Sequence, residues 1–106
     1  MKLKKFQFTK VKSTNDTSIR LIRNGKNCGI VTSEVQTKGK GQRGNKWISK
    51  KGNIFISIFF KINSKISLKK LTKKNLSILK NIISKQVKNN IKVKLPNDIL
   101  IDKKKV

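Results

Sequence analysis

The stretch Gly39-Lys40-Gly41-Gln42-Arg43-Gly44-Asn45-Lys46-Trp47 indicates more about the fold than any other part of the chain. Its glycines let the backbone turn sharply and approach a ligand closely, so that cations and backbone N–H groups face the inside of the turn. Such a loop suits an anion, although a segment rich in glycine and lysine is also typical of a mobile surface connection. It is not a Walker A loop, because Asn45 follows Gly44 where that motif needs lysine and then serine or threonine.

Apolar strands are predicted on both sides of this loop. Residues 29–35 form a buried strand in this interpretation, and Phe6 and Phe8 alternate with polar neighbours in an earlier strand over about residues 5–11. Residues 53–60 form a further strand, in which one face carries Ile54, Ile56, Ile58 and Phe60 and the other carries Phe55, Ser57 and Phe59.

Two helices and a second group of strands complete the prediction. Thr14 or Asn15 can cap a helix that ends at Asn24-Gly25, with Ser18, Ile19 and Ile22 on its inner side. Helical spacing predicts an amphipathic helix over about residues 72–89, and its apolar side consists of Leu76, Leu79, Ile82, Ile83 and Val87. Residues 91–95 and 98–103 then form a strand pair, or one strand bent at Pro96, which cannot donate to a central ladder.

The charge balance is strongly basic. The 106 residues include 28 Lys and Arg against 4 Asp and Glu, which gives a formal net charge of +24. Cations at this density bind nucleic acid without sequence preference. Only Arg20, Arg23 and Arg43 can form a bidentate fork, however, which disfavours specific recognition of bases or phosphates. An AT-rich coding sequence explains the excess of lysine, isoleucine and asparagine, and nonspecific nucleic-acid binding stays as an alternative.

The remaining composition excludes several kinds of site. With a single cysteine, Cys28, and no histidine, the chain has no internal disulfide and offers neither a plausible zinc site nor a histidine-based triad. No apolar run has the length of a signal peptide core or a membrane span. We therefore expect a cytoplasmic protein with no membrane partner.

Four short blocks occur in order along the chain: Lys12-Ser13-Thr14-Asn15-Asp16, then Glu34-Val35-Gln36-Thr37 before the glycine loop, then Lys94-Leu95-Pro96-Asn97-Asp98, and finally Asp102-Lys103-Lys104-Lys105-Val106. Together they resemble the biotin protein ligases, which join biotin to a carrier lysine through biotinyl-AMP. The resemblance covers nearly the whole chain. The sequence departs from the family where Lys40, Gln42 and Asn45 stand at positions that often carry arginine, and where Leu95 replaces a tryptophan.

The resemblance implies an α/β fold of the class II aminoacyl-tRNA synthetase and biotin ligase type, a mixed sheet with flanking helices. The family's catalytic module is longer than this chain, so residues 1–106 are expected to be the N-terminal part of one such domain, without its C-terminal half and C-terminal domain. Because few residues precede the first strand, we also expect no DNA-binding domain of the kind that some biotin ligases carry ahead of it.

By the same resemblance, short polar side chains bind biotin, because hydroxyls and amides satisfy a ureido group without adding charge. The alternative for Ser13, Thr14 and Asn15 is simple helix capping. Trp47 stacks near the adenylate or anchors the loop in the core. The implied residues are Ser13, Thr14, Asn15, Gln36, Gly39 and Gln42 for biotin, and Lys40, Gly41, Arg43, Gly44 and Trp47 for the carboxylate, the α-phosphate and the adenylate, with Lys40 and Arg43 as catalytic cations.

Lys105 is the third catalytic cation that the resemblance implies, in contact with the same oxygens. Lys103 and Lys104 beside it leave the register open by one residue, and Asn97 and Asp98 are expected to orient the lysine. The implied co-substrate is ATP with Mg²⁺, an ion that phosphate oxygens and water usually hold. The implied partner is the biotin carboxyl carrier protein domain of acetyl-CoA carboxylase. The alternatives are an inactive ligase fragment, a basic nucleic-acid-binding protein or a lipoate-protein ligase.

Overall fold

The structure of the protein, a computed structural model, describes residues 2–63, 65–95 and 98–105. The chain divides into two compact units, residues 1–61 and residues 62–106. The glycine loop and the predicted biotin residues belong to the first unit, whereas Asp98 and Lys105 belong to the second.

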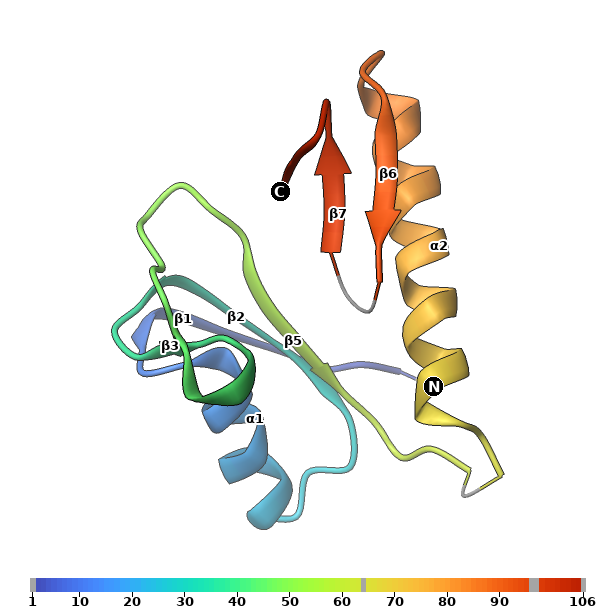
Figure 1. Cartoon of the computed structure of the whole chain (residues 1–106). Coiled ribbons are helices and arrows are strands. Elements are labelled where there is room, and N and C mark those ends of the chain that lie inside the picture. The colour runs from blue at the N-terminus through green and yellow to red at the C-terminus, as the bar shows by residue number, and fades with distance from the viewer. Residues whose placement is uncertain (1, 64, 96–97, 106) are drawn as a thin grey trace. The chain divides into compact units, whose positions relative to one another are not determined.

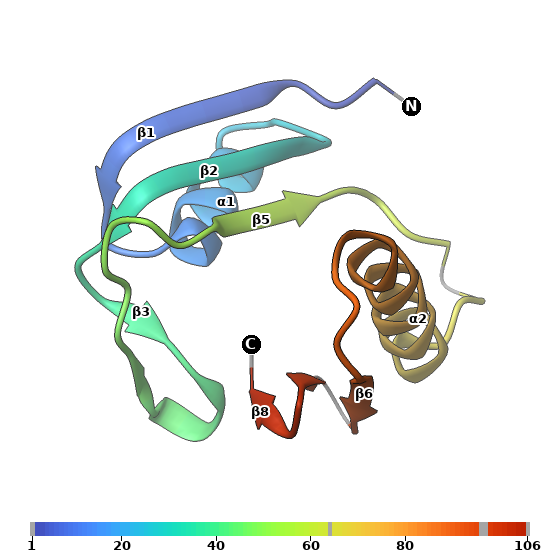
Figure 2. The same ribbon diagram turned by 90° about the horizontal axis from the view of Figure 1, so that it is seen from above.

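The first unit contains a three-stranded sheet in the order β1 (Lys5–Val11), β2 (Gly29–Gln36), β5 (Phe55–Phe59) (Figure 1). Strand β1 is parallel to β2, whereas β5 is antiparallel to it. Figure 2 shows β2 between the two other strands. The three strands predicted in this part of the chain are therefore confirmed, and β5 starts two residues later than expected.

One face of this sheet carries the core of the first unit. The register places Phe6 beside Val31 and Val31 beside Ser57, so these side chains share a face, together with Phe55 and Phe59 by alternation. Val31 is fully buried. A Cβ at Gly29 would lie 2.9 Å from ring atoms of both Phe6 and Phe59, so only glycine leaves room for the two rings.

Helix α1 (Thr14–Arg23) connects β1 to β2 and contacts β2 and β5. Its N-cap is Ser13, whose Oγ accepts a hydrogen bond from Asp16 N at 2.9 Å, so the prediction of Thr14 or Asn15 as the cap was wrong by one or two residues. The helix ends as predicted, with Asn24 as C-cap and Gly25 at a φ of +91°.

The inner side of α1 is polar. Ile19 and Ile22 are 46% and 50% exposed, so their predicted inward position was wrong, and that of Ser18 was right. The residues that face the sheet instead follow the spacing i, i+3, i+4 and have small side chains: Thr14, Thr17 and Ser18. The hydroxyls of Thr17 and Ser18 donate to the carbonyls of Ser13 and Thr14, each at 2.9 Å, which allows these polar groups to be buried.

The connection from β2 to β5 contains a small hairpin made by the glycine loop. Strand β3 (Gly39–Lys40) pairs with β4 (Lys46–Trp47) in an antiparallel manner, and the 3₁₀ turn η1 (Gln42–Gly44) joins them. Gly41 N donates to Asn45 O at 2.7 Å at the base of the turn. The loop predicted between the two apolar strands therefore has a defined local structure.

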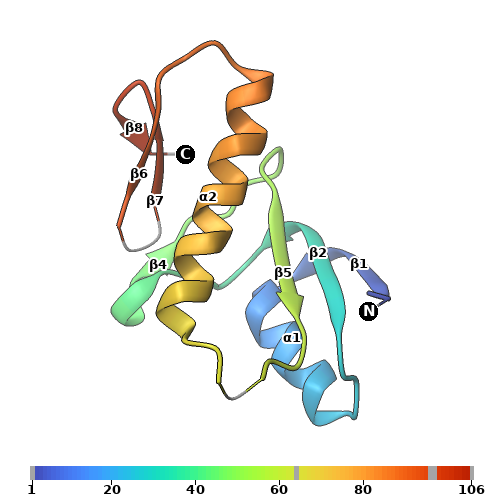
Figure 3. The same cartoon turned by 90° about the vertical axis from the view of Figure 1, so that its right-hand side faces the viewer.

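The second unit contains helix α2 (Leu68–Gln86) and the antiparallel strands β6 (Ile91–Lys94), β7 (Asp98–Ile101) and β8 (Lys104–Lys105), in the order β6-β7-β8. Figure 3 shows α2 alongside β6 and β7. The predicted strand pair is confirmed. The helix begins earlier than the predicted residue 72 because Ser67 is its N-cap, and it ends before 89 because Val87 is extended.

The apolar stripe of α2 is only partly buried. Leu76 and Ile91 are buried, and Ile83 and Val87 are half-buried. Leu79 and Ile82 are 48% and 53% exposed, so two of the five predicted inward positions were wrong. The helix packs on β6 and β7 through one side of its stripe, and hydrophobic spacing alone does not indicate which side that is.

The two helices and the mixture of parallel and antiparallel strands confirm the predicted α/β class with a mixed sheet. Within the described residues, neither helix has the length and apolar character that crossing a membrane requires.

Candidate ligand-binding site

Gln36, at the end of β2, joins three segments of the first unit. Its Oε1 accepts hydrogen bonds from Thr14 N at 2.8 Å and from Thr14 Oγ1 at 3.2 Å, while its Nε2 donates to Ser49 Oγ at 2.9 Å. An amide oxygen has two lone pairs and an amide nitrogen has two N–H groups. Counting the bonds among described residues, Gln36 thus keeps one N–H with which to donate to a ligand.

A small polar pocket of about 160 Å³ opens beside the start of α1. Ser13 and Thr14 are almost entirely buried there, and Ser13 Oγ serves both as the helix cap and as a wall of the pocket. The structure thus brings together most of the side chains predicted to bind biotin. The lining consists of Ser13, Thr14, Asn15, Gln36, Lys40, Ile56 and Ser57.

Ser57 is a lining residue that the sequence prediction missed. Its Oγ lies 2.7 Å from Thr14 Oγ1 and 2.6 Å from Asn15 Oδ1, and its single hydroxyl hydrogen can be donated to one of them. A signal was present, because Ser57 is the one polar residue between Ile54 and Phe60 and alternates with Ile56 and Ile58. Ser57 therefore lies against the side chains of two predicted biotin residues and can donate to one of them.

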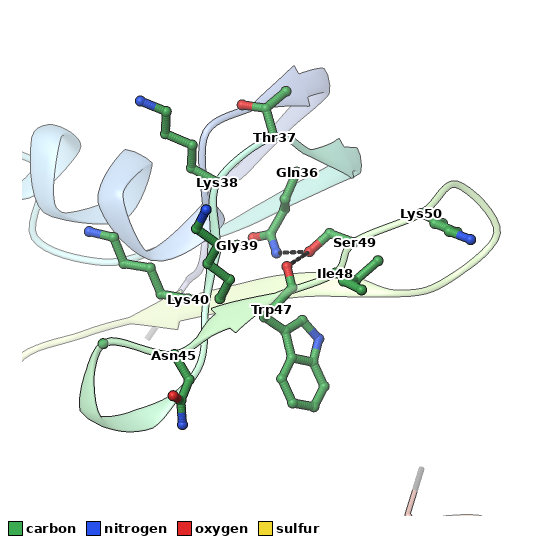
Figure 4. Close-up of a pocket in the computed structure, with 12 residues that line it drawn as sticks. Gln36, Thr37, Lys38, Gly39, Lys40, Asn45, Trp47, Ile48, Ser49 and Lys50 are labelled. Carbon is green, nitrogen blue, oxygen red and sulfur yellow. Dashed lines mark hydrogen bonds between the residues drawn. The ribbon is translucent and has the colours of Figure 1, made fainter.

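A larger groove of about 820 Å³ follows the glycine loop, within the range of about 300–1,000 Å³ that is usual for small-molecule sites (Figure 4). Of the predicted residues it is lined by Gln36, Gly39, Lys40, Gly44 and Trp47. Figure 4 shows the Gln36 amide directed at Ser49, whose Oγ donates to Trp47 O at 3.2 Å. Ser49 is a second residue that the sequence prediction missed.

Gly39 lies at the closest approach of this groove's walls. A Cβ at this position would overlap Ser49 Oγ, would lie 2.6 Å from Trp47 O and would lie 3.0 Å from Gln36 Nε2. The hydrogen-bonded chain from Gln36 through Ser49 to Trp47 therefore requires glycine here. Gly39 contributes to the groove by leaving space for Ser49 and for the Trp47 carbonyl.

The tip of the hairpin carries the remaining predicted loop residues. Gln42 and Arg43 are exposed, and Arg43 adopts left-handed backbone angles, with a φ of 57° and a ψ of 38°. Gly41, Gln42 and Arg43 do not line the small polar pocket or the larger groove in this structure. Contact between these residues and a ligand would need a movement of the tip.

Lys40 has a carboxylate partner in the first unit. Its Nζ lies 3.0 Å from Asp16 Oδ1, and the two side chains are 61% and 41% exposed. Asp16 lies two residues after Thr14 in α1, beside the small polar pocket, and the sequence prediction gave it no role in the site. The cation nearest to this pocket is therefore neutralised by a side chain of the same unit.

Lys105 and Asp98 form an ion pair in the second unit, with Nζ and Oδ1 3.1 Å apart. Asp102 and Lys103 have φ of 49° and 68° and form the turn between β7 and β8, so Lys103 does not continue the strand. Asn97 lies outside the described residues. The predicted orienting role of Asp98 agrees with this ion pair and remains a prediction.

Among the described residues, no group of three or more Cys, Asp or Glu side chains lies close enough to hold a metal ion.

Comparison with known proteins identifies the family of the chain and solved structures with a similar fold. Residues 5–106 match the sequence model of the biotin/lipoate A/B protein ligase family. The chain is similar to the biotin acetyl coenzyme A carboxylase synthetase of Helicobacter pylori with bound biotinylated ATP, with a TM-score of 0.79 and 21% identity over 99% of this chain and 52% of that chain.

Two further solved structures are similar. The biotin protein ligase of Aquifex aeolicus in complex with biotin and ATP has a TM-score of 0.79 and 27% identity, over 97% of this chain and 44% of that chain. The biotin protein ligase of Leishmania major in complex with biotinyl-5-AMP has a TM-score of 0.70 and 22% identity, over 100% of this chain and 50% of that chain. The chain therefore spans about half the length of these proteins.

Proposed function

Because the chain belongs to the biotin/lipoate A/B protein ligase family, we propose that it acts in biotin-protein ligation. In this reaction ATP activates biotin to biotinyl-AMP with release of pyrophosphate. A lysine of the biotin carboxyl carrier protein domain of acetyl-CoA carboxylase then attacks the acyl carbon and releases AMP. We place the protein in the cytoplasm, where its carrier protein would be found.

The small polar pocket is the observation that supports biotin most directly. Its hydroxyls and amides can donate and accept, as a ureido group with two N–H donors and one carbonyl requires. Gln36 has one N–H left for the ureido carbonyl, and Lys40 supplies a cation at the edge of the pocket for the carboxylate. The Asn15, Ser13 and Thr14 side chains complete the polar wall.

The first step joins two anions, the biotin carboxylate and the α-phosphate. Repulsion and poor alignment make this reaction slow, so the site must supply positive charge and hold the reactants in line. In our proposal Lys40 and Arg43 supply the charge, and Gln42 and the backbone of Gly39, Gly41 and Gly44 close around the carboxylate and the phosphate. Arg43 is at the exposed tip, so the loop changes conformation when the ligand binds.

Lys105 is the third cation of the proposal. It is preferred over Lys103 and Lys104 because Asp98 holds its Nζ at 3.1 Å and because Lys103 lies in the turn before β8. We assign Asp98 the orientation of Lys105 and keep Asn97 as a second orienting residue. Trp47, which borders the larger groove, contacts the adenylate or anchors the loop, and Mg²⁺ accompanies ATP through its phosphate oxygens.

Calorimetry with the full chain at about 150 mM salt tests this proposal, since exposed charges are well screened there. We expect saturable binding of biotin, weaker binding of lipoate, and a mass for biotinyl-AMP once MgATP is added. Binding without adenylate would indicate an inactive ligase fragment, and preference for lipoate would move the chain to the other branch of the family. Absence of binding to either acid would refute the biotin function.

A further inference from the structure

Asp16 links the helix beside the small polar pocket to the glycine loop. Its backbone N–H donates to Ser13 Oγ at 2.9 Å, which fixes the backbone of Asp16 at the third position of α1. Its Oδ1 lies 3.0 Å from Lys40 Nζ in β3, a residue 24 positions away in the chain. The ion pair therefore ties a loop strand to the start of a helix.

The direction of Lys40 follows from this contact. Figure 4 shows its side chain extending toward the ribbon of α1 and away from Trp47 on the paired strand. The backbone of Lys40 is held by pairing with Lys46, so an anion that binds the ammonium group is connected to the hairpin through the lysine side chain. Such an anion limits how far the hairpin can move from α1.

Asp16 also has other cations within its surroundings. It borders a separate cleft together with Lys10, Lys12 and Arg20. Asp16 and Glu34 are the only acidic residues in residues 1–61. Phe8 and Val11 also line this cleft, but its three cations give a carboxylate displaced from Lys40 other positive charges nearby, which makes its release less costly.

From this geometry we propose that Asp16 is a positioning residue, which holds the glycine loop on α1 through Lys40 until a ligand carboxylate takes its place. The inference rests on the proposed function, because it assigns biotin as the incoming carboxylate. One carboxylate replaces another on the same ammonium group, so the charge around Lys40 is conserved. The loop, which Lys40 tied to Asp16, is then tied to the substrate. The neutral analogue biotinamide cannot make this exchange.

The loop is tested first without ligand, by hydrogen exchange of the peptide that covers residues 39–47. An ion pair as exposed as this one contributes modestly, so we expect Asp16→Asn to raise exchange there about twofold to fivefold. Glu34→Gln removes the same charge from the same unit and should leave exchange unchanged. Salt at about 1 M should bring the wild type close to Asp16→Asn, because screening weakens the pair.

The exchange of carboxylates is tested by binding biotin and biotinamide to the same proteins. Because the uncharged amide of the Asp16→Asn variant does not compete for Lys40, the preference for biotin over biotinamide should rise about twofold to fivefold in that variant and stay constant in Glu34→Gln. Equal loop exchange in the wild type and Asp16→Asn would overturn the holding role, and an unchanged preference would overturn the replacement by ligand. If the wild type binds neither compound, the biotin function fails, and hydrogen exchange still decides whether Asp16 holds the loop.

Discussion

Replacing Gly39 with alanine should damage the candidate site through a single added methyl group. The new Cβ would overlap Ser49 Oγ and would lie 2.6 Å from Trp47 O. Ser49 can rotate away, but Trp47 O belongs to the backbone of the paired strand β4 and cannot move alone. The substitution should therefore separate β3 from β4 or push Ser49 away from Gln36.

The cost can be estimated from these contacts. Overpacking of a well-packed position typically destabilises by about 1–3 kcal/mol, a range that includes the cost of about 1 kcal/mol for losing one neutral hydrogen bond. We expect Gly39→Ala to lower the free energy of unfolding by about 2 kcal/mol. For a unit of this size that corresponds to a decrease in melting temperature of roughly 8–16 °C.

Gly41→Ala is the matched control. The nearest heavy atoms to its added Cβ belong to Asn45 at 3.4 Å, and the φ of Gly41 is −90°, so alanine fits without strain. We expect its free energy of unfolding to stay within about 0.5 kcal/mol of the wild type or to rise, because alanine restricts the unfolded chain. Trp47 is the only tryptophan of the chain, so its fluorescence during urea unfolding reports on the first unit. Equal stability of the two variants would refute the close approach at Gly39.

Four other predictions concern Gln36, the core side of α2, the lysines of β8 and the net charge. Gln36→Ala should lower the free energy of unfolding by about 1–3 kcal/mol and weaken biotin binding, because Thr14 and Ser49 lose a hydrogen-bond partner, measured by urea unfolding and calorimetry. Leu76→Ala should cost about 2–4 kcal/mol in thermal unfolding, whereas the exposed Leu79→Ala should cost less than about 1 kcal/mol. Lys105→Ala should abolish biotinyl-AMP formation, measured by mass spectrometry, while Lys104→Ala should retain it. Binding to duplex DNA, followed by fluorescence polarisation, should collapse between about 50 and 200 mM salt.

Each of these four predictions would be contradicted by a specific result. Unchanged stability of Gln36→Ala would show that its bonds contribute little, and equal effects at Leu76 and Leu79 would contradict the assignment of the core side of α2. Adenylate formation by Lys105→Ala would remove that lysine from the mechanism. DNA binding that persists in high salt, together with absent biotin binding, would favour a nucleic-acid function over a ligase function.

The strands of the first unit could be predicted because their signal is local. Alternation along residues 53–60 separates Phe55 and Phe59 from Ile56 and Ile58, and the structure buries the two phenylalanines. A period of two depends only on neighbouring residues, so no tertiary information is needed. The observed strand ends still differ from the predicted ones, because pairing with the neighbouring strand determines where a ladder ends.

The inner face of α1 could not be predicted from hydrophobicity. Ile19 and Ile22 form the more apolar side, yet Thr17 and Ser18 face the sheet. The hydroxyls of these two residues bond to the carbonyls of the preceding turn, a solution that a count of apolar residues does not include. Burial here was decided by which small side chains let the helix approach β2 and β5.

The missed site residues have a related cause. Ser49 and Ser57 are common residue types with no motif of their own, and only long-range pairing gives them a role. Ser57 reaches α1 because β5 pairs with β2 in the register that sets it opposite Val31. Ser13, Gln36 and their neighbours could be predicted because they belong to sequence blocks that resemble a family. An isolated serine belongs to no such block, so the resemblance does not identify it.

Gly29 has a consequence for how the first sheet is assembled. A slip of β2 by two residues would keep every side chain on its own face, so the alternating pattern alone does not exclude it. Such a slip would set the side chain of Val31 where the rings of Phe6 and Phe59 now converge on a bare Cα. The glycine therefore restricts the three strands to one register. In that register the end of β2, with Gln36, lies beside the first turn of α1.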